Sequence, residues 1–298
     1  MSWIQIKADI TPNIAEAMEE SLLAAGASAV TMEDAHDQPI LEPERGTTPL
    51  WEKTIITGLF SADEDTEQIK TIAHNVFCGL SSETFPDCKI EILENQDWTR
   101  KWMEHFEPIH IGSRLWICPS WRDVPDNNAV NLMLDPGLAF GTGTHPTTFL
   151  CLKWLDAASL ENKDIIDYGC GSGILGIAGL LLGAKNVIAV DNDPQALLAT
   201  KDNANRNNIT EDLIKAYLPD ETPQEPADIV IANILAKPLY ELKSRIGALC
   251  KTNGQVILSG ILEHQAAELS EFYSDTFTMA PIIIEDGWAR LTGTKKAP

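Results

Sequence analysis

The chain has 298 residues, a length that suits about two domains of roughly 150 residues each. Hydrophobic residues make up 44% of the chain, an ordinary fraction for a globular protein. Acidic residues outnumber basic residues by 44 to 22, so the formal net charge is −22. A surface of this sign repels nucleic-acid backbones, so we expect no direct nucleic-acid binding and favour a basic protein as partner.

The six cysteines are scattered, without a Cys-x-x-Cys pair or a secretory leader, so we expect reduced thiols and a cytoplasmic location. The longest apolar run, residues 174–184, is interrupted by glycines and is shorter than the roughly 20 residues of a membrane span. We therefore expect no membrane association. None of the histidines pairs with a cysteine or carboxylate at ligand spacing, so no metal is expected.

Residues 1–96 are predicted to form a ferredoxin-like α+β domain. Alternation with period two predicts strands, and spacing of three to four predicts helices, in the order β-α-β-β-α-β. The predicted strands are residues 3–10, 29–32, 54–60 and 89–93, and the predicted helices are residues 14–25 and 66–77. This arrangement indicates a shape but no chemistry, because it hosts many functions. Residues 1–97 carry a net charge of −14, from 19 acidic and 5 basic residues.

Residues 97–130 are interpreted as a linker. It contains a short predicted helix around Trp98 and Trp102 and an extended segment at 114–119. The two tryptophans share a helix face by their i, i+4 spacing, and we interpret them as packing residues.

Residues 131–298 are predicted to form a doubly wound, Rossmann-like α/β domain, because short apolar strands alternate with helices from Thr147 onward. The predicted helices are 147–158, 174–183, 194–207 and 238–250, and the predicted strands are 164–168, 187–191, 228–232 and 255–259. The segments 281–285 and 288–293 are predicted to add a hairpin to this sheet.

A glycine-rich turn follows the first of these strands, in the sequence Ile165-Ile-Asp-Tyr-Gly-Cys-Gly-Ser-Gly. Glycines at 169, 171 and 173 permit a tight turn and let a ligand touch the main chain at the carboxyl end of the sheet. Asp191 ends the next strand, 22 residues after Gly169. A carboxylate at that place accepts hydrogen bonds from both hydroxyls of a ribose.

Two ligand classes use such a turn. Residues 171–176 match the dinucleotide pattern Gly-x-Gly-x-x-Gly. However, Asp167 precedes the first glycine, where a carboxylate opposes a pyrophosphate but suits the ammonium of S-adenosylmethionine. The pattern Asp-x-Gly-x-Gly-x-Gly, followed by Asp191-Asn-Asp-Pro, resembles the class I methyltransferase signature.

Two further segments are candidate parts of the site. Asn233 ends a buried strand where N-methyltransferases place an Asn-Pro-Pro-Tyr turn, but here both prolines and the aromatic residue are absent. Its side-chain oxygen or nearby backbone carbonyls are expected to orient an amine, and a structural capping role is the alternative. Residues 134–148 include Phe140 and His145 and are interpreted as closing over a bound nucleoside, with a plain linker as the alternative.

Five segments together resemble the bacterial ribosomal protein L-eleven methyltransferase family, in order and along the whole chain. They begin at Trp98, Arg114, Asp135, Asp167 and Ala232; the third, Asp135-Pro-Gly-Leu-Ala-Phe-Gly-Thr-Gly-Thr-His-Pro-Thr-Thr, and the turn Asn-Ile-Leu-Ala are the most specific. The resemblance implies an S-adenosylmethionine-dependent enzyme that methylates lysine side chains and the N-terminal amine of ribosomal protein L-eleven. It implies that the ferredoxin-like domain recognises this ribosomal protein. It also implies that Thr148, Gly169, Asp191 and Asn233 contact the cofactor.

From the residues alone we expect Gly171 to bind the cofactor as well, and Asn233 to be catalytic by orienting a neutral amine without a dedicated base. Alternative functions are an NAD-linked oxidoreductase and a noncatalytic protein that senses a small molecule. A methyltransferase acting on RNA is disfavoured by the charge of the first domain.

Overall fold

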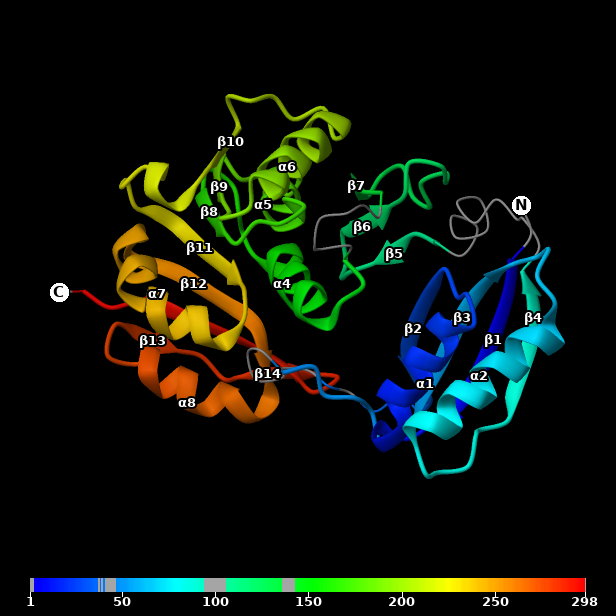
Figure 1. Ribbon diagram of the computed structural model, residues 1–298. Helices are drawn as coiled ribbons and strands as arrows, with labels where there is room; N and C mark the ends of the chain where they lie inside the picture. The colour runs from blue at the N-terminus through cyan, green and yellow to red at the C-terminus, as the bar shows by residue number, and fades with distance from the viewer. Residues whose placement is uncertain are drawn as a thin grey trace. The chain divides into compact units, whose positions relative to one another are not determined.

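The computed structural model describes residues 3–36, 38, 40, 47–93, 106–135 and 143–297. It divides into two compact units, Met1–Met103 and Glu104–Pro298 (Figure 1). The helix predicted around Trp98 and Trp102 lies outside the described residues.

The first unit is a four-stranded antiparallel sheet with two helices. Its elements are β1 (Trp3–Ile10), α1 (Pro12–Ala24), β2 (Ala29–Asp34), β3 (Thr54–Ser61), α2 (Thr66–Leu80) and β4 (Cys88–Leu93). The strand order is β2-β3-β1-β4, with every neighbouring pair antiparallel. The predicted ferredoxin-like fold is confirmed, and the element ends differ from the prediction by a few residues.

Alternation along β1 decides which face of this sheet is covered. Ile4, Ile6, Ala8 and Ile10 are buried, whereas the residues between them are partly or fully exposed. The buried side chains join those of α1 and α2 in one hydrophobic cluster, which includes Phe77. The two helices therefore pack on one face of the sheet (Figure 1).

The second unit is built on an eight-stranded sheet with the order β10-β9-β8-β11-β12-β15-β13, in which β14 also pairs with β15. Its helices and strands are α4 (Pro146–Ala157), β8 (Asp164–Tyr168), α5 (Ile174–Leu181), β9 (Asn186–Val190), α6 (Pro194–Arg206), β10 (Ile214–Tyr217), β11 (Ala227–Asn233), α7 (Ala236–Leu249), β12 (Cys250–Leu262), α8 (Glu263–Tyr273), β13 (Phe277–Met279), β14 (Ile283–Glu285) and β15 (Trp288–Lys295). A 3-10 turn lies at Pro219–Glu221.

The five strands from β10 to β12 are parallel, and β15 is antiparallel to its three neighbours. The predicted doubly wound α/β domain and its terminal hairpin are therefore confirmed.

Both faces of this sheet are buried. Ile229 and Ile231 belong to the hydrophobic cluster that also holds side chains of α4 and α5, whereas Val230 belongs to the cluster with α7 and α8. The continuous apolar run at residues 229–232 of β11 follows from this, because alternate residues enter opposite cores.

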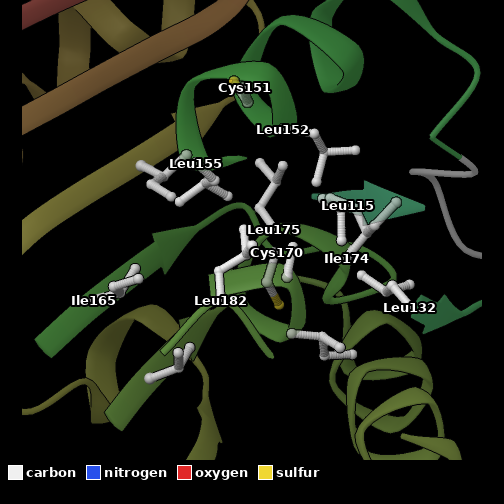
Figure 2. Packing of buried hydrophobic residues seen from close by; sticks show 14 of the residues in the cluster. Leu115, Leu132, Cys151, Leu152, Leu155, Ile165, Cys170, Ile174, Leu175 and Leu182 are labelled. Carbon is white, nitrogen blue, oxygen red and sulfur yellow. The ribbon is translucent and has the colours of Figure 1, made fainter. Parts of the chain in front are cut away.

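A three-stranded sheet of β5 (Ile109–His110), β6 (Leu115–Cys118) and β7 (Val130–Met133) completes the second unit. Leu115 and Leu132 from this sheet share a core with Leu152 and Leu175 from α4 and α5 (Figure 2). The segment interpreted as a linker thus contains β5, β6 and the first residue of β7.

The sequence prediction lacked β5, β7, β10, α8 and β13, and it gave only residues 255–259 of β12, whereas the extended segment predicted at 114–119 contains β6. β10 is a short strand at the sheet edge with only Ile214 buried, so it lacks an apolar run. The six cysteines are all free, and Cys78 on α2 is the one that is exposed. No helix in the described part of the chain is long and apolar enough to cross a membrane.

Candidate functional site

The glycine turn between β8 and α5 adopts backbone dihedral angles that residues with a side chain disfavour. Gly169, Gly171 and Gly173 have φ angles of 82°, 52° and 78°. L-residues other than glycine rarely adopt positive φ, because the Cβ atom approaches the backbone. The turn therefore exposes main-chain atoms at the carboxyl end of β8, where doubly wound sheets bind ligands.

Neighbouring elements hold this turn in place. The carbonyl oxygen of Val190 accepts hydrogen bonds from the N–H groups of Gly169 and Cys170, at 2.7 and 3.0 Å. On α6, the Thr200 hydroxyl donates to the Gly171 carbonyl at 3.1 Å, and Asn203 Nδ2 donates to the Ser172 carbonyl at 2.8 Å.

Thr200 and Asn203 were not among the residues predicted for the site. Both are buried polar residues, three positions apart on α6. That spacing places them on one helix face, which was the available signal.

Asp191 directly follows β9 and contacts the same turn. Its Oδ2 accepts a hydrogen bond from the Gly171 N–H at 2.9 Å, and its Oδ1 accepts one from the Asp193 N–H at 3.0 Å. Each carboxylate oxygen has further lone pairs, so Asp191 retains acceptor capacity for ligand hydroxyls.

Asp167, at 1% exposure, is the most deeply buried carboxyl group near the turn. Its Oδ2 accepts from the Gly176 N–H at 3.0 Å, while Oδ1 is buried with no hydrogen-bond partner in the described part of the chain. Burial raises the pKa of Asp167 to about 7; the Gly176 hydrogen bond opposes this shift and the charge of Asp191 adds to it. An unpaired buried carboxyl is costly, and this one is suited to a cationic ligand group.

Asn233 and Thr148 are 85 positions apart and meet at this edge of the sheet. Asn233 Nδ2 donates a hydrogen bond to Thr148 Oγ1 at 3.2 Å. Thr148 lies in the first turn of α4 and is 3% exposed. Asn233 Oδ1 is buried, and no described residue provides it with a hydrogen-bond partner. The amide is thus fixed by its nitrogen and leaves its oxygen as a free acceptor.

Strand pairing explains why Asn233 reaches the glycine turn. β11 lies parallel to β8, with Ile231 opposite Asp167. Two residues further along the two strands are Asn233 and Gly169, and a Cβ atom on Gly169 would overlap the side chain of Ile234. The two segments are in direct contact.

His145 caps α4. Its Nδ1 accepts a hydrogen bond from the Thr147 N–H at 3.3 Å and lies 2.8 Å from the Thr147 hydroxyl. The ring packs edge-on to Trp288 with centroids 4.8 Å apart, and burial lowers its pKa. These contacts favour a structural role. Residues 136–142 of the segment predicted to close over a nucleoside, including Phe140, lie outside the described residues.

The residues present fit S-adenosylmethionine better than a dinucleotide. Two buried oxygens, Asp167 Oδ1 and Asn233 Oδ1, have no partner among the residues described, and both accept hydrogen bonds from cationic or amine groups. A pyrophosphate would need free N–H donors in the first turn of α5. One of these, the N–H of Gly176, already donates to the Asp167 carboxyl. The fold and this site define a class I, S-adenosylmethionine-dependent methyltransferase.

Comparison with known proteins gives the family. Residues 2–296 match the family model described as ribosomal protein L11 methyltransferase (PrmA). A ribosomal protein L11 methyltransferase of Marinomonas sp. (strain MWYL1) is 55% identical over 297 residues, which is 100% of both chains. One from Ectopseudomonas mendocina (strain ymp) is 52% identical over 297 residues, covering 99% of this chain and 100% of the relative.

A solved structure supports the same assignment. The crystal structure of ribosomal protein L11 methylase from Lactobacillus delbrueckii subsp. bulgaricus is similar with a TM-score of 0.58 and 31% identity, over 64% of this chain and 100% of that chain. The chain belongs to the ribosomal protein L11 methyltransferase family. This membership decides against the oxidoreductase and the noncatalytic alternatives.

Proposed function

We propose that this enzyme methylates lysine side chains and the N-terminal amine of ribosomal protein L11 in the cytoplasm. The names of its curated relatives support this substrate. So does the charge of −14 on residues 1–97, because an acidic surface attracts a basic protein. We assign recognition of that substrate to residues 1–96 and methyl transfer to residues 131–298.

Five residues are assigned to the cofactor. Asp191 accepts hydrogen bonds from the ribose hydroxyls, and Gly169 and Gly171 offer main-chain contact without a Cβ atom in the way. Thr148 on α4 and Asn233 at the end of β11 form one side of the site.

We add Asp167 as a partner of the ligand ammonium, because its buried Oδ1 lacks a partner in the described chain. S-adenosylmethionine bound there would supply a methyl group on a positively charged sulfur; as the amine nitrogen bonds to that methyl carbon, the carbon–sulfur bond would break and the neutral thioether would be the leaving group.

Asn233 is assigned the catalytic role. Its Oδ1 accepts a hydrogen bond from an N–H of the incoming amine, which aims the amine lone pair at the methyl group. The observation that carries this role is the combination of a buried, unpartnered Oδ1 with an Nδ2 held by Thr148. In this orientation the amide presents its oxygen as the acceptor.

The acceptor amine must lose a proton before transfer. At pH 7 this costs about 4–5 kcal/mol for a lysine with a pKa near 10.4, and about 1 kcal/mol for an α-amine with a pKa near 8. Desolvation in the site and the sulfonium charge both lower the amine pKa. His145 is not assigned as base, since its Nδ1 is engaged in the cap of α4. The proton leaves to water.

The test is incubation of the full chain with radiolabelled S-adenosylmethionine, purified ribosomal protein L11 and ribosomal RNA. The label in protein and RNA is measured separately, and the modified sites on L11 are identified by mass spectrometry. We expect label on lysine residues and on the N-terminal amine. Label on ribosomal RNA and none on L11 would overturn the substrate assignment.

Asn233→Ala is expected to lower kcat by about 10²-fold, the scale of losing one positioning contact. The matched control is Asn205→Ala, because Asn205 is exposed on α6. Wild-type kcat in Asn233→Ala would contradict the catalytic role.

A further inference from the structure

The turn that carries Asn233 lacks the residues that stiffen such turns elsewhere. The sequence there is Asn233-Ile234-Leu235, without the two prolines of an Asn-Pro-Pro-Tyr turn. Proline restricts φ to about −65°, so a turn with two prolines is rigid by itself. In this chain the rigidity has to come from the surroundings.

The side chain of Ile234 packs on the glycine turn. A Cβ atom added to Gly169 would overlap Ile234 Cγ2, so this methyl group fills the space above the glycine. Gly169 has a φ of 82° and is fixed by its hydrogen bond to Val190. Ile234 therefore rests on a backbone that is itself held.

The backbone of Ile234 packs on a second glycine. A Cβ atom on Gly260 would overlap the Ile234 carbonyl oxygen and would lie 2.7 Å from its carbonyl carbon and 2.9 Å from its nitrogen. Gly260 has a φ of 83° and lies where the pairing of β12 with β15 shifts register, between Leu258 and Ile261. The Ile234 N–H also donates to the Ser259 carbonyl at 3.1 Å.

We propose that Ile234 is a positioning residue, clamped between Gly169 and Gly260, and that this clamp replaces the missing prolines. It links the glycine turn, which contacts the cofactor, to the turn that carries Asn233. The part of the proposal that concerns transfer rests on the proposed role of Asn233. The part that concerns cofactor binding does not depend on the methyl acceptor.

A rescue experiment tests the contact between Gly169 and Ile234. Gly169→Ala creates an overlap with Ile234 Cγ2, and we expect the Kd for S-adenosylmethionine, measured by calorimetry, to rise at least tenfold. Adding Ile234→Ala removes Cγ2, so the double variant should regain at least threefold in affinity. Gly169→Ala with Ile234→Val is the matched control, since valine keeps the methyl group that clashes.

In the Gly169→Ala background, a direct contact with Ile234 predicts that Ile234→Ala restores affinity for S-adenosylmethionine and that Ile234→Val does not. Equal effects of the two substitutions, or a double variant that binds no more tightly than Gly169→Ala alone, would overturn the clamp. The experiment needs no ribosomal protein, so it remains decisive even if L11 is not the substrate.

Gly260 provides the test on transfer. Gly260→Ala is expected to lower kcat for L11 at least tenfold, because the added Cβ displaces the turn that carries Asn233. Gly183→Ala is the control: Gly183 also has positive φ, at 108°, but nothing lies within 4 Å of its added Cβ.

Wild-type kcat in Gly260→Ala, or equal losses of kcat in Gly260→Ala and Gly183→Ala, would contradict the proposal. If Gly260→Ala does not fold, the calorimetric rescue still decides.

Discussion

Asp167 combines full burial with an oxygen that no described residue contacts. Desolvation favours its neutral form in the free protein, and the pKa of about 7 expresses that preference. Because the unfolded chain loses this proton near pH 4, Asp167 contributes stability that is complete below about pH 4 and is lost as the pH rises to about 7. A bound ammonium reverses the balance and favours the ionised form.

We therefore predict that Asp167→Asn gains stability relative to the wild type as the pH rises from about 5 to about 8, because asparagine never ionises. Urea denaturation of both free proteins at the two pH values measures this. The same variant should bind S-adenosylmethionine more weakly at pH 8, since the ionic partner of the ammonium is lost. A stability difference that does not change with pH would show that Asp167 titrates normally.

Variants at Thr148 test whether the orientation of the Asn233 amide affects methyl transfer. Thr148→Val keeps the shape but removes the acceptor of Asn233 Nδ2, so the amide no longer has a fixed orientation. Losing one hydrogen bond of about 1–1.5 kcal/mol predicts a fall in kcat of about tenfold. Thr148→Ser restores the hydroxyl and should restore kcat. Steady-state kinetics with L11 decide, and equal rates in the valine and serine variants would contradict the prediction.

Most residues of the candidate site could be predicted from the sequence, because each lies at or near the end of a predicted strand. The glycines, Asp167, Asp191 and Asn233 each directly follow or end an apolar strand, so the strand pattern alone places them at one edge of the sheet. Gly260 could not be predicted, since its proposed role depends on close approach to the backbone of Ile234, which lies in the turn after β11.

Among the elements, α6 supports the glycine turn from outside. Asn203 Nδ2 donates to the Ser172 carbonyl, and its Oδ1 accepts from Arg206 at 2.9 Å. The helix thus holds the turn through polar contacts, in addition to the close approach of Thr200 to Gly173.

We expect Asn203→Ala to lower the free energy of unfolding by about 1–2 kcal/mol, because the Ser172 carbonyl loses its donor. The Kd for S-adenosylmethionine should rise a few-fold, since the turn becomes looser. Thermal denaturation and calorimetry measure the two effects, and Asn205→Ala, exposed on the same helix, is the control. Unchanged values in Asn203→Ala would exclude the support role.

Strong hydrophobic patterns decided which elements could be predicted. β9 and β11 contain apolar runs and β8 contains the buried pair Ile165 and Ile166, and all three strands were predicted within one or two residues. β5 has two residues and β10 has one buried residue, so neither leaves such a pattern. The small sheet becomes evident as part of the second unit only in the structure, where Leu115 and Leu132 pack with residues of α4 and α5 (Figure 2).

At the scale of the whole molecule, charge is distributed unevenly along the chain. Residues 1–97 carry −14 of the total −22, although they are about a third of the 298 residues. Charges of one sign on one unit steer an oppositely charged partner toward it and are weakened by salt.

We predict that kcat/KM for L11 falls severalfold between about 50 and 300 mM salt, because screening shortens the range of this attraction. The Kd for S-adenosylmethionine should change little, since that site lies in the other unit and is largely buried. Initial rates and calorimetry across the salt series test both. A kcat/KM that does not depend on salt would rule out electrostatic steering by the first unit.

The placement of the thiols makes the unmodified chain suitable for labelling. Cys151 and Cys170, which lie near the site, are buried, and burial raises the pKa of both. A thiol reacts through its thiolate, so these two are protected from alkylation. Cys78, exposed on α2, is the cysteine that a maleimide dye reaches first. A fluorophore attached there would sit on the acidic unit, and under the proposed recognition by residues 1–96 we expect its emission to change when the ribosomal protein docks, without a cysteine being added or removed.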